Sequence, residues 1–503
     1  MMHFRKIILI PFFFIPAIVS HCNPLNSEIG KNDDLVLLLG AYSILGANCT
    51  SGPDLWARDL RTQASVCVPV ELVSSGTNIE VYKERSLSTS FNLVQFAKDF
   101  DTITYPRLVA TFGPPSDVDG DGKIKILIFD IKDGATANSA YVAGFYDPIN
   151  YFPDNFFSRV RSNFSEVLYL DGRELIAANT TDPNAFASTA AHEFQHLLRF
   201  PRMYEANQND ELWINEGTSE VASDLAGFGP QISRLDCYAG VNDSRCNDGI
   251  NGVSLLDWSG SSSEILKQYS FAYVFMRFLY DSAGTTETEK NQFFRNSVLG
   301  TGGVRANSTG NLMNVFRSSA NFSATDLTNN NSDIFFRLYA LLTAYSFEIS
   351  NLSSVQQVTS DNQNPITVNL SGAALRYPLP TSLNRLLTYP VSPITSKTTI
   401  KQGAANFYST SIPTISAPNT RKNYGRITGL GSKGIVFWAD SPQGLNANLK
   451  FVPGKDDTPI QNPNRPRSMK SVLDSASNQG PIPICGIEFT TALTHTYESI
   501  PIE

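Results

Sequence analysis

The chain has 503 residues, too many for one ordinary hydrophobic core, so we expect two or three domains. Apolar residues make up 42% and charged residues 17%, a globular composition that excludes wholesale disorder. The net charge of −8 and the lack of a basic cluster argue against nucleic-acid binding, which depends on a basic face.

Residues 1–21 have the pattern of a secretory signal. Arg5 and Lys6 precede the apolar run Ile7–Val19, which is too short to span a bilayer comfortably. The pattern predicts an exported protein, secreted or held at the bacterial cell surface. Cys22 stands where a bacterial lipoprotein is cleaved and lipidated, although His21 replaces the small residue that is usual there. A lipid anchor at Cys22, with membrane attachment, and an ordinary cleavage nearby both stay open.

The other cysteines allow disulfides, because export leads to an oxidising environment. The simplest pairs are Cys49–Cys67 and Cys237–Cys246, which are close in sequence. If Cys22 is lipidated, Cys485 is left over. Sequence alone does not fix this pairing.

Short strands and turns are expected through residues 22–90, because apolar or β-branched runs alternate there with Gly, Ser and Pro. Residues 91–352 mix helix and strand and then become mainly helical. Before the main helices, Phe91–Phe100 has helical spacing. Strands are expected over Leu35–Leu39, Ala64–Leu72, Asn78–Tyr82, Ile124–Asp130 and Glu166–Tyr169.

Three later helices are indicated by their end signals. The first begins with Asp182 as N-cap and Pro183 at N1, and we expect Pro201 to end it. The second runs from about Leu212 to Leu225. The third opens with Ser261 and Glu264, spaced as a capping box, and continues to about Asp281.

The character of the chain changes after about residue 352. The polar stretch Ser353–Pro365 is a predicted linker, and short β-branched segments such as Ile366–Leu370 and Ile435–Ala439 follow it. Residues 366–503 are therefore expected to form an all-β C-terminal module. The chain as a whole predicts an α+β fold.

The first of the three helices carries a metal-binding motif, Ala191-His192-Glu193-Phe194-Gln195-His196. Residues four apart lie on one face of a helix, so His192 and His196 can ligate the same ion. Glu193 is rotated roughly 100° from His192, which places its carboxylate beside the metal. The alternative is an amphipathic core helix with two satisfied histidines.

Two imidazoles leave a zinc site short of ligands. The expected third ligand is Glu216, twenty residues beyond His196 and early in the second helix. Glu220, one turn further on, is expected to accept a hydrogen bond from a ligand imidazole. The fourth position is left for water.

These motifs resemble those of the gluzincin metallopeptidases, of which thermolysin is the familiar member. Several stretches resemble, more narrowly, the hyicolysin family of bacterial extracellular peptidases: Asp117–Lys123, Ala143–Pro148, Leu168–Asp171, Ala191–His196, Asn215–Gly217 and Tyr269–Tyr280. The resemblance covers roughly residues 80–350 and implies that residues 91–352 form a zinc metallopeptidase domain acting on protein or peptide substrates. It also implies that His192, His196 and Glu216 bind zinc and that Glu193 is the catalytic base. Glu220 departs from the pattern, because thermolysin-like enzymes carry Asp there.

The oxyanion formed during hydrolysis needs a further hydrogen-bond donor. Thermolysin-like enzymes use a downstream histidine, and this chain offers only His495, far from the motif. We therefore expect a tyrosine of the third helix to donate, Tyr269 before Tyr273. The alternative is that both are core aromatics at i, i+4 spacing.

A second cation site is suggested by Asp117, Asp119 and Asp121, which alternate as at the start of an EF-hand, with Gly122 sixth. Ile128 takes the twelfth position instead of Glu, and a strand is expected to follow, so this is not an EF-hand. Three neighbouring carboxylates repel unless a cation or solvent intervenes. The loop is therefore either a structural calcium site or a solvated hairpin turn.

Two other functions compete with an endopeptidase. Zinc aminopeptidases share the metal motif but usually carry a Gly-x-Met-Glu-Asn segment, which this chain lacks. The other competing function is a surface adhesin with a vestigial zinc site. The intact Glu193 argues against it, because a vestigial site has no need of a catalytic base.

Overall fold

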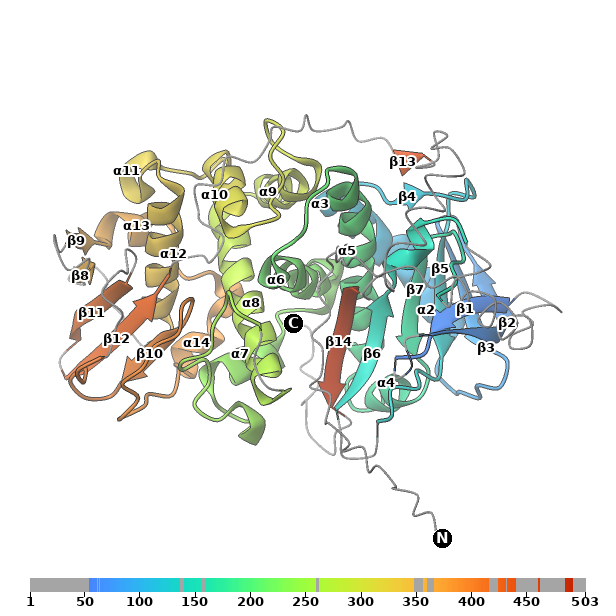
Figure 1. Cartoon of the computed structure of the whole chain (residues 1–503), viewed down its shortest axis with the longest axis horizontal. Coiled ribbons are helices and arrows are strands. Elements are labelled where there is room, and N and C mark those ends of the chain that lie inside the picture. Colours follow the sequence, from blue (N-terminus) through green and yellow to red (C-terminus); the bar gives the residue numbers. More distant parts are fainter. Residues whose placement is uncertain are drawn as a thin grey trace, which may run out of the picture.

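The computed structural model (Figure 1) describes much of the chain between residues 54 and 491. The described residues are 54–60, 62, 64–135, 140–154, 160–258, 262–347, 356–359, 366–415, 424–430, 432–439, 460–461 and 485–491. The expected signal sequence, Cys22, Cys49, Leu35–Leu39, Ser261 and His495 lie outside these residues. A seven-stranded sheet, a group of helices and a five-stranded sheet follow one another along the long axis, which confirms the α+β class.

The larger sheet has the strand order β1-β2-β3-β5-β7-β6-β14. β3, β5 and β7 run parallel, and the other neighbours are antiparallel. The bounds are β1 Asp54–Arg58, β2 Ser65–Ser75, β3 Ile79–Glu84, β5 Ile124–Phe129, β6 Ala140–Tyr146, β7 Val167–Asp171 and β14 Cys485–Thr491. The expected strands over Ala64–Leu72, Asn78–Tyr82, Ile124–Asp130 and Glu166–Tyr169 are thus confirmed as β2, β3, β5 and β7.

Both faces of this sheet are covered, which explains why β5 and β7 are nearly unbroken apolar runs. Alternate residues point to opposite faces of a strand. Ile126 and Leu168 therefore join the main core beneath the helices, whereas Leu127 and Tyr169 join a smaller cluster on the other face. In that cluster the rings of Phe145 and Tyr169 stack with centroids 4.6 Å apart.

Helices of the first half pack on the main-core face of the sheet. They are α2 Leu93–Asp99, η1 Phe100–Thr104, α3 Tyr105–Phe112, α4 Glu174–Ala178 and α5 Ala185–Glu205. α2 confirms the helical spacing of Phe91–Phe100. The aromatic rings of Phe96 and Phe186, from α2 and α5, meet edge to face at 4.9 Å.

The boundaries predicted for α5 are wrong at both ends. Asn184 stands at the N-cap, and Asp182 accepts a hydrogen bond from the amide of Asn184 instead of capping the first turn. The helix also continues through Pro201 to Glu205. A proline removes one hydrogen bond of the helical ladder, and stacking of the last-turn Tyr204 on Phe200 at 5.8 Å favours the helical course beyond it.

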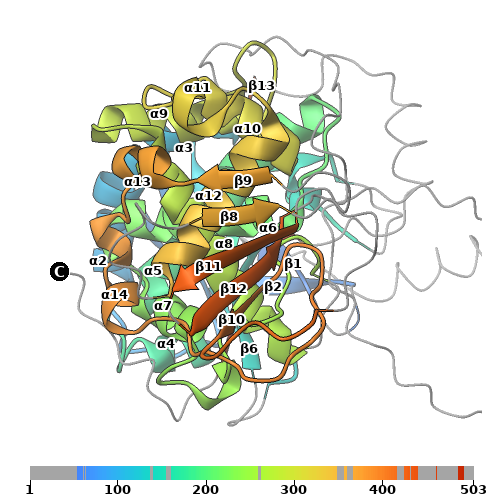
Figure 2. The same cartoon turned by 90° about the vertical axis from the view of Figure 1, so that its left-hand side faces the viewer.

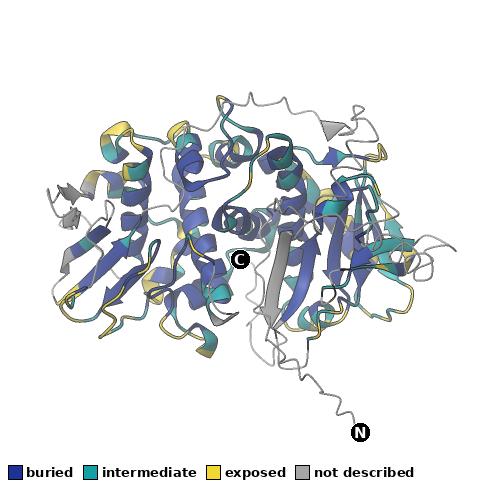
Figure 3. Cartoon of the chain, viewed as in Figure 1, coloured by how far each residue is buried: buried dark blue, intermediate teal, exposed yellow. Residues whose placement is uncertain are grey.

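The central helices extend from residue 212 to residue 345. They are α6 Leu212–Ser223, η3 Asp224–Phe228, α7 Ile232–Ala239, η4 Ser244–Cys246, α8 Ser262–Ala283, α9 Glu287–Leu299, α10 Thr309–Arg317, α11 Ala324–Leu327 and α12 Asn331–Tyr345. The second and third predicted helices are confirmed as α6, which continues into η3, and α8. Figure 3 shows that buried residues dominate this central region.

The smaller sheet has the order β10-β12-β11-β8-β9 and lies against α12, as Figure 2 shows. Its strands are β8 Gln356–Thr359, β9 Ile366–Asn369, β10 Ala405–Tyr408, β11 Tyr424–Leu430 and β12 Lys433–Trp438. The ring of Phe437 packs on Phe336 and Tyr339 of α12, with centroids 5.0 and 5.6 Å apart.

Residues 366–503 are not all β as expected. They include α13 Ser371–Arg376, η6 Thr381–Leu383 and α14 Arg385–Thr388. β13 Ile460–Gln461 pairs with β4 Ser116–Asp117, and β14 joins the larger sheet beside β6. The domain boundaries at residues 90 and 352 remain predictions. Strands before each boundary pair with strands after it, β3 with β5 across residue 90 and β6 with β14 across residue 352.

Asn251 connects the helical region with the C-terminal part of the chain. Its side-chain amide donates to the carbonyl of Ser392 at 2.7 Å, and its Oδ1 accepts from the amide of Phe407 at 2.8 Å. It is buried. The loop before α8 and the strand β10 are therefore held as one unit.

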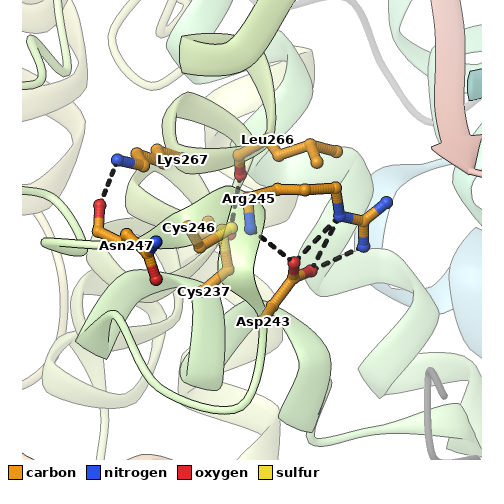
Figure 4. Close-up of a disulfide and its surroundings, with 8 residues drawn as sticks. Cys237, Asp243, Arg245, Cys246, Asn247, Leu266 and Lys267 are labelled. Atoms are coloured by element: carbon orange, nitrogen blue, oxygen red, sulfur yellow. Dashed lines mark hydrogen bonds and ion pairs between the residues drawn. A yellow bond between two sulfur atoms is a disulfide. The ribbon is translucent and has the colours of Figure 1, made fainter. Parts of the chain in front are cut away.

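A disulfide joins Cys237 at the end of α7 to Cys246, as expected from their spacing (Figure 4). Asp243, in the loop between them, pairs with Arg245, and Lys267 of α8 donates to the carbonyl of Asn247. Cys67 is also disulfide-bonded. Its expected partner, Cys49, lies outside the described residues, so that pairing remains a prediction.

Among the described residues, every helix is either too short or too polar to serve as a membrane span.

Candidate metal centre

Two histidines of α5 converge on one point. His192 and His196 are one helical turn apart and are both buried, and their Nε2 atoms lie 3.1 Å from each other. The helix lies close to the sheet here: a β-carbon at Gly144 of β6 would come within 2.9 Å of the Thr189 side chain, one turn before Glu193. Small residues on both elements thus allow the motif to sit deep in the core.

Glu216 of α6 completes the group. Its Oε2 lies 3.4 Å from Nε2 of His192 and 3.6 Å from Nε2 of His196. This oxygen is buried and has no hydrogen-bond partner among the described residues. Burial alone would raise the pKa of Glu216, but the adjacent His196 and His192 lower it to about 2. The group is therefore an anionic oxygen facing two ring nitrogens.

Together the three residues can hold a metal ion. One ligand atom from each lies within 4.8 Å of the other two, and all three side chains are buried. A buried carboxylate oxygen with no donor is costly, and a cation at this point would satisfy it and both ring nitrogens. The residues present therefore fit a metal.

The ring of His196 is held from behind by two groups that the sequence did not suggest. Its Nδ1 lies 3.2 Å from Oδ1 of Asn215 and 3.3 Å from Oγ of Ser219. Since Oδ1 of Asn215 is an acceptor, Nδ1 donates to it, and Nε2 faces the point where His192 and Glu216 converge. Ser219 also donates to Oε1 of Gln195 at 2.5 Å, which fixes its hydroxyl.

Glu220 lies behind His192, as expected from its position one turn after Glu216, but it is not within hydrogen-bond distance. Its Oε1 is 3.8 Å from Nδ1 of His192, beyond a direct hydrogen bond. The carboxylate is instead held by Arg234 of α7, through bonds of 2.9 and 2.7 Å. Arg234 is another residue that sequence reasoning missed.

Glu193 and Tyr269 both border the metal-binding group. Glu193 is fully buried beside His192 on α5. The pKa of the Tyr269 phenol is raised well above its ordinary value, first by burial and then by the charges of Glu216, Glu220 and Glu193. The side chain is buried, and its phenol stays protonated.

Tyr273, the alternative to Tyr269, is engaged elsewhere. Its hydroxyl donates to Oδ2 of Asp224 at 2.7 Å and accepts from the amide of Gln231 at 3.0 Å. Tyr204, near the end of α5, is a third phenol and lies in an aromatic cluster with Phe200 and Tyr151. The role of Tyr269 as the oxyanion donor remains a prediction.

The acidic loop at Asp117, Asp119 and Asp121 does bring three carboxylates within 4.8 Å of one another. An ammonium group already lies between two of them: Nζ of Lys125 is 2.8 Å from Asp119 and 2.6 Å from Asp121. Burial opposes the charge of Asp119, but its hydrogen bond to Lys125 prevails and lowers its pKa. Calcium binding remains a prediction, with Lys125 as its competitor.

Comparison with known proteins points to a peptidase. The chain is 27% identical over 226 residues to the neutral metalloprotease ShpI of Staphylococcus hyicus. The match covers 44% of this chain and 49% of that protein, so the chain spans about half the length of this relative. No family model matches the chain. The similarity supports a metallopeptidase with a metal cofactor, and the group His192, His196 and Glu216 is where such a metal can bind.

Proposed function

We propose that this chain is an exported zinc-dependent endopeptidase of the gluzincin type, similar to the hyicolysin family. The observation that carries the proposal is the convergence of the two Nε2 atoms and Oε2 of Glu216 in a buried site. Two imidazoles and one carboxylate are a common ligand set of catalytic zinc sites, and such sites leave a fourth position open. Two nitrogens bound tetrahedrally to one zinc lie ~3.3 Å apart, close to the separation of the two Nε2 atoms.

His192, His196 and Glu216 would hold the ion. Zinc bound there would act as a Lewis acid toward the attacking water and the scissile carbonyl. Asn215 and Ser219 fix the ring of His196 with Nε2 toward the ion, by the contacts described above. Glu216 brings one negative charge, so the three protein ligands together offset half the charge of a divalent cation.

We assign the proton transfers to Glu193. It lies beside His192 in a water-poor site, where it takes a proton from the attacking water and passes it to the leaving amine. Tyr269 keeps its phenolic proton and donates it to the oxyanion in a hydrogen bond. Both roles need a substrate carbonyl within reach of the metal, and a protein or peptide chain supplies it.

Export follows from the signal pattern of residues 1–21, and Cys22 offers a lipid anchor at the cell surface. The same environment suits the disulfide between Cys237 and Cys246. The substrates we propose are therefore extracellular proteins or peptides.

Zinc content and cleavage, measured on the purified full-length chain, test the proposal. We expect one zinc per chain, internal cleavage of casein and of a peptide library, loss of cleavage with a chelator, and its return with zinc. Glu216→Ala should lose both zinc and activity, because two imidazoles alone bind zinc weakly. Glu205→Ala is the matched control, a carboxylate on α5 that accepts from Tyr151, and should keep both.

Each other outcome points to a different function. Release of N-terminal residues alone would indicate an aminopeptidase. Bound zinc without any cleavage would favour a non-catalytic surface protein. A full equivalent of zinc in Glu216→Ala would show that the third ligand is a different residue.

A further inference from the structure

We propose that Arg234 is a positioning residue of the metal site, which fixes Glu220 behind His192 and the ring of Tyr269 beside it, and thereby raises the affinity for the metal. The inference rests on the proposed function, since it assigns Arg234 a role toward the same ion. Arg234 itself is not a ligand and acts through Glu220 and Tyr269.

The first observation is a buried, two-pronged ion pair. Nε of Arg234 donates to Oε2 of Glu220 at 2.9 Å, and Nη2 donates to Oε1 at 2.7 Å. Arg234 is 6% exposed and Glu220 is 1% exposed. Two parallel bonds fix the plane of a carboxylate as well as its position. The oxygen that Nη2 holds, Oε1, is the one facing Nδ1 of His192 at 3.8 Å.

The second observation is the contact between Arg234 and Tyr269. The guanidinium carbon lies 5.1 Å from the centre of the Tyr269 ring, within cation–π distance. The ring also meets Trp258 edge to face, with centroids 5.1 Å apart. One guanidinium thus contacts both the carboxylate behind His192 and the proposed oxyanion donor.

The local chain course supports this placement. α7, which carries Arg234, follows Gln231, whose side-chain amide donates to the backbone carbonyl of Glu220 at 2.7 Å. The start of α7 is therefore tied to α6 by the backbone of Glu220 as well as by its side chain. These bonds hold the guanidinium of Arg234 next to Glu220, one helical turn after Glu216 on α6.

The charge balance explains why an arginine is needed. α6 brings Glu216 and Glu220 into the core, and Glu193 lies nearby on α5. Buried carboxylates so close together repel one another unless cations accompany them. A metal would compensate Glu216, and Arg234 compensates Glu220. The pairing also accounts for Glu in place of Asp at position 220, because the longer side chain reaches Arg234 of α7.

Zinc affinity, measured by competition with a chelator of known affinity, tests this role independently of activity. Groups that orient metal ligands typically contribute ~10- to 100-fold to metal affinity. We expect Arg234→Gln to weaken zinc binding by about tenfold or more. Arg234→Lys should fall between wild type and Arg234→Gln, because lysine restores the charge but not the planar fork.

The matched control is Arg58 of β1, which forms a similar buried, two-pronged pair with Asp147, directly after β6, at 2.9 and 2.8 Å. Arg58→Gln should lower the melting temperature and leave the zinc dissociation constant within about twofold of wild type, as expected for a pair that only stabilises the fold. If Arg234→Gln behaves like Arg58→Gln, the positioning role is refuted.

A double variant keeps the test valid if Arg234→Gln folds poorly. Arg234→Gln with Glu220→Gln leaves no unpaired charge, so it should fold, yet zinc binding should stay weak because neither side chain orients His192 as before. Wild-type zinc affinity in this variant would overturn the inference. A wild-type chain that binds zinc but cleaves nothing would refute the proposed peptidase and leave the affinity comparison intact.

Discussion

A β-carbon at Gly217 would come within 2.9 Å of the carbonyl oxygen of Ala272. Gly217 directly follows Glu216, so the close approach of α6 to α8 sets the depth of the Glu216 carboxylate. Gly217→Ala should push the helices apart, lower the melting temperature and weaken zinc binding together. Ser223→Ala, later on α6, removes one bond to the carbonyl of Ser188 but adds no volume, and should keep zinc affinity. Unchanged zinc affinity in a folded Gly217→Ala protein would contradict this reasoning.

Glu193→Gln should retain zinc and fold normally but lose peptide hydrolysis. The amide cannot accept a proton, and loss of a general base typically costs ~10²–10⁴ in rate. Zinc content and kcat on one peptide measure the two effects separately. Near-normal turnover would exclude Glu193 as the base.

Tyr269→Phe should lower kcat by ~10²–10³ with little change in KM, because an oxyanion donor acts mainly in the transition state. Tyr273→Phe is the matched control, one turn away on α8. Its hydroxyl bonds to Asp224 and Gln231, so its loss should lower stability and leave kcat nearly unchanged. If Tyr273→Phe loses kcat and Tyr269→Phe does not, the oxyanion donor is Tyr273, one helical turn further along α8.

Calcium should raise the melting temperature if the loop of Asp117, Asp119 and Asp121 binds it, since a ligand of the native state stabilises in proportion to the logarithm of its concentration. Asp119→Asn should remove most of this gain, because it weakens one of three carboxylates. Thermal unfolding with calcium and with a chelator makes the comparison. A melting temperature indifferent to calcium would mean that the loop binds no calcium and that Lys125 is the cation paired with Asp119 and Asp121.

Glu166 should make stability fall as the pH rises from about 4.5 to about 7. Burial raises its folded-state pKa from 4.5 to about 7, and hydrogen bonds from Ser116 and Val118 only partly oppose this. Between these values the unfolded chain releases a proton that the folded protein keeps, so folding becomes less favourable, by on the order of 3 kcal/mol at most. In Glu166→Gln the dependence of unfolding free energy on pH should be flatter over this range. An unchanged slope would assign the dependence to other groups.

The metal-binding group could be predicted because its geometry follows from local rules. Helical periodicity places His192 and His196 on one face, and a short connection brings Glu216 opposite them. Arg234 could not be found in this way, because its pairing with Glu220 depends on how α7 packs against α6 and α8. The course of α5 beyond Pro201 likewise depends on aromatic packing that local signals do not contain.

The pairing of distant strands was also beyond the sequence. β14 pairs with β6 although more than three hundred residues separate them. The sequence of neither segment indicates which strand it pairs with. The hydrophobic pattern did predict where most strands lie, because alternating or continuous apolar residues indicate a strand with one or two buried faces. It did not indicate which sheet a strand enters.

Asn251 has a practical consequence for limited proteolysis. Its bonds to Ser392 and Phe407, together with the packing of Phe437 on α12, join segments on both sides of residues 353–365. A single cut by a protease within that stretch would therefore yield two fragments that stay associated in a native gel and separate only in denaturant. The nicked protein would behave as one particle, with His192, His196 and Glu216 still together.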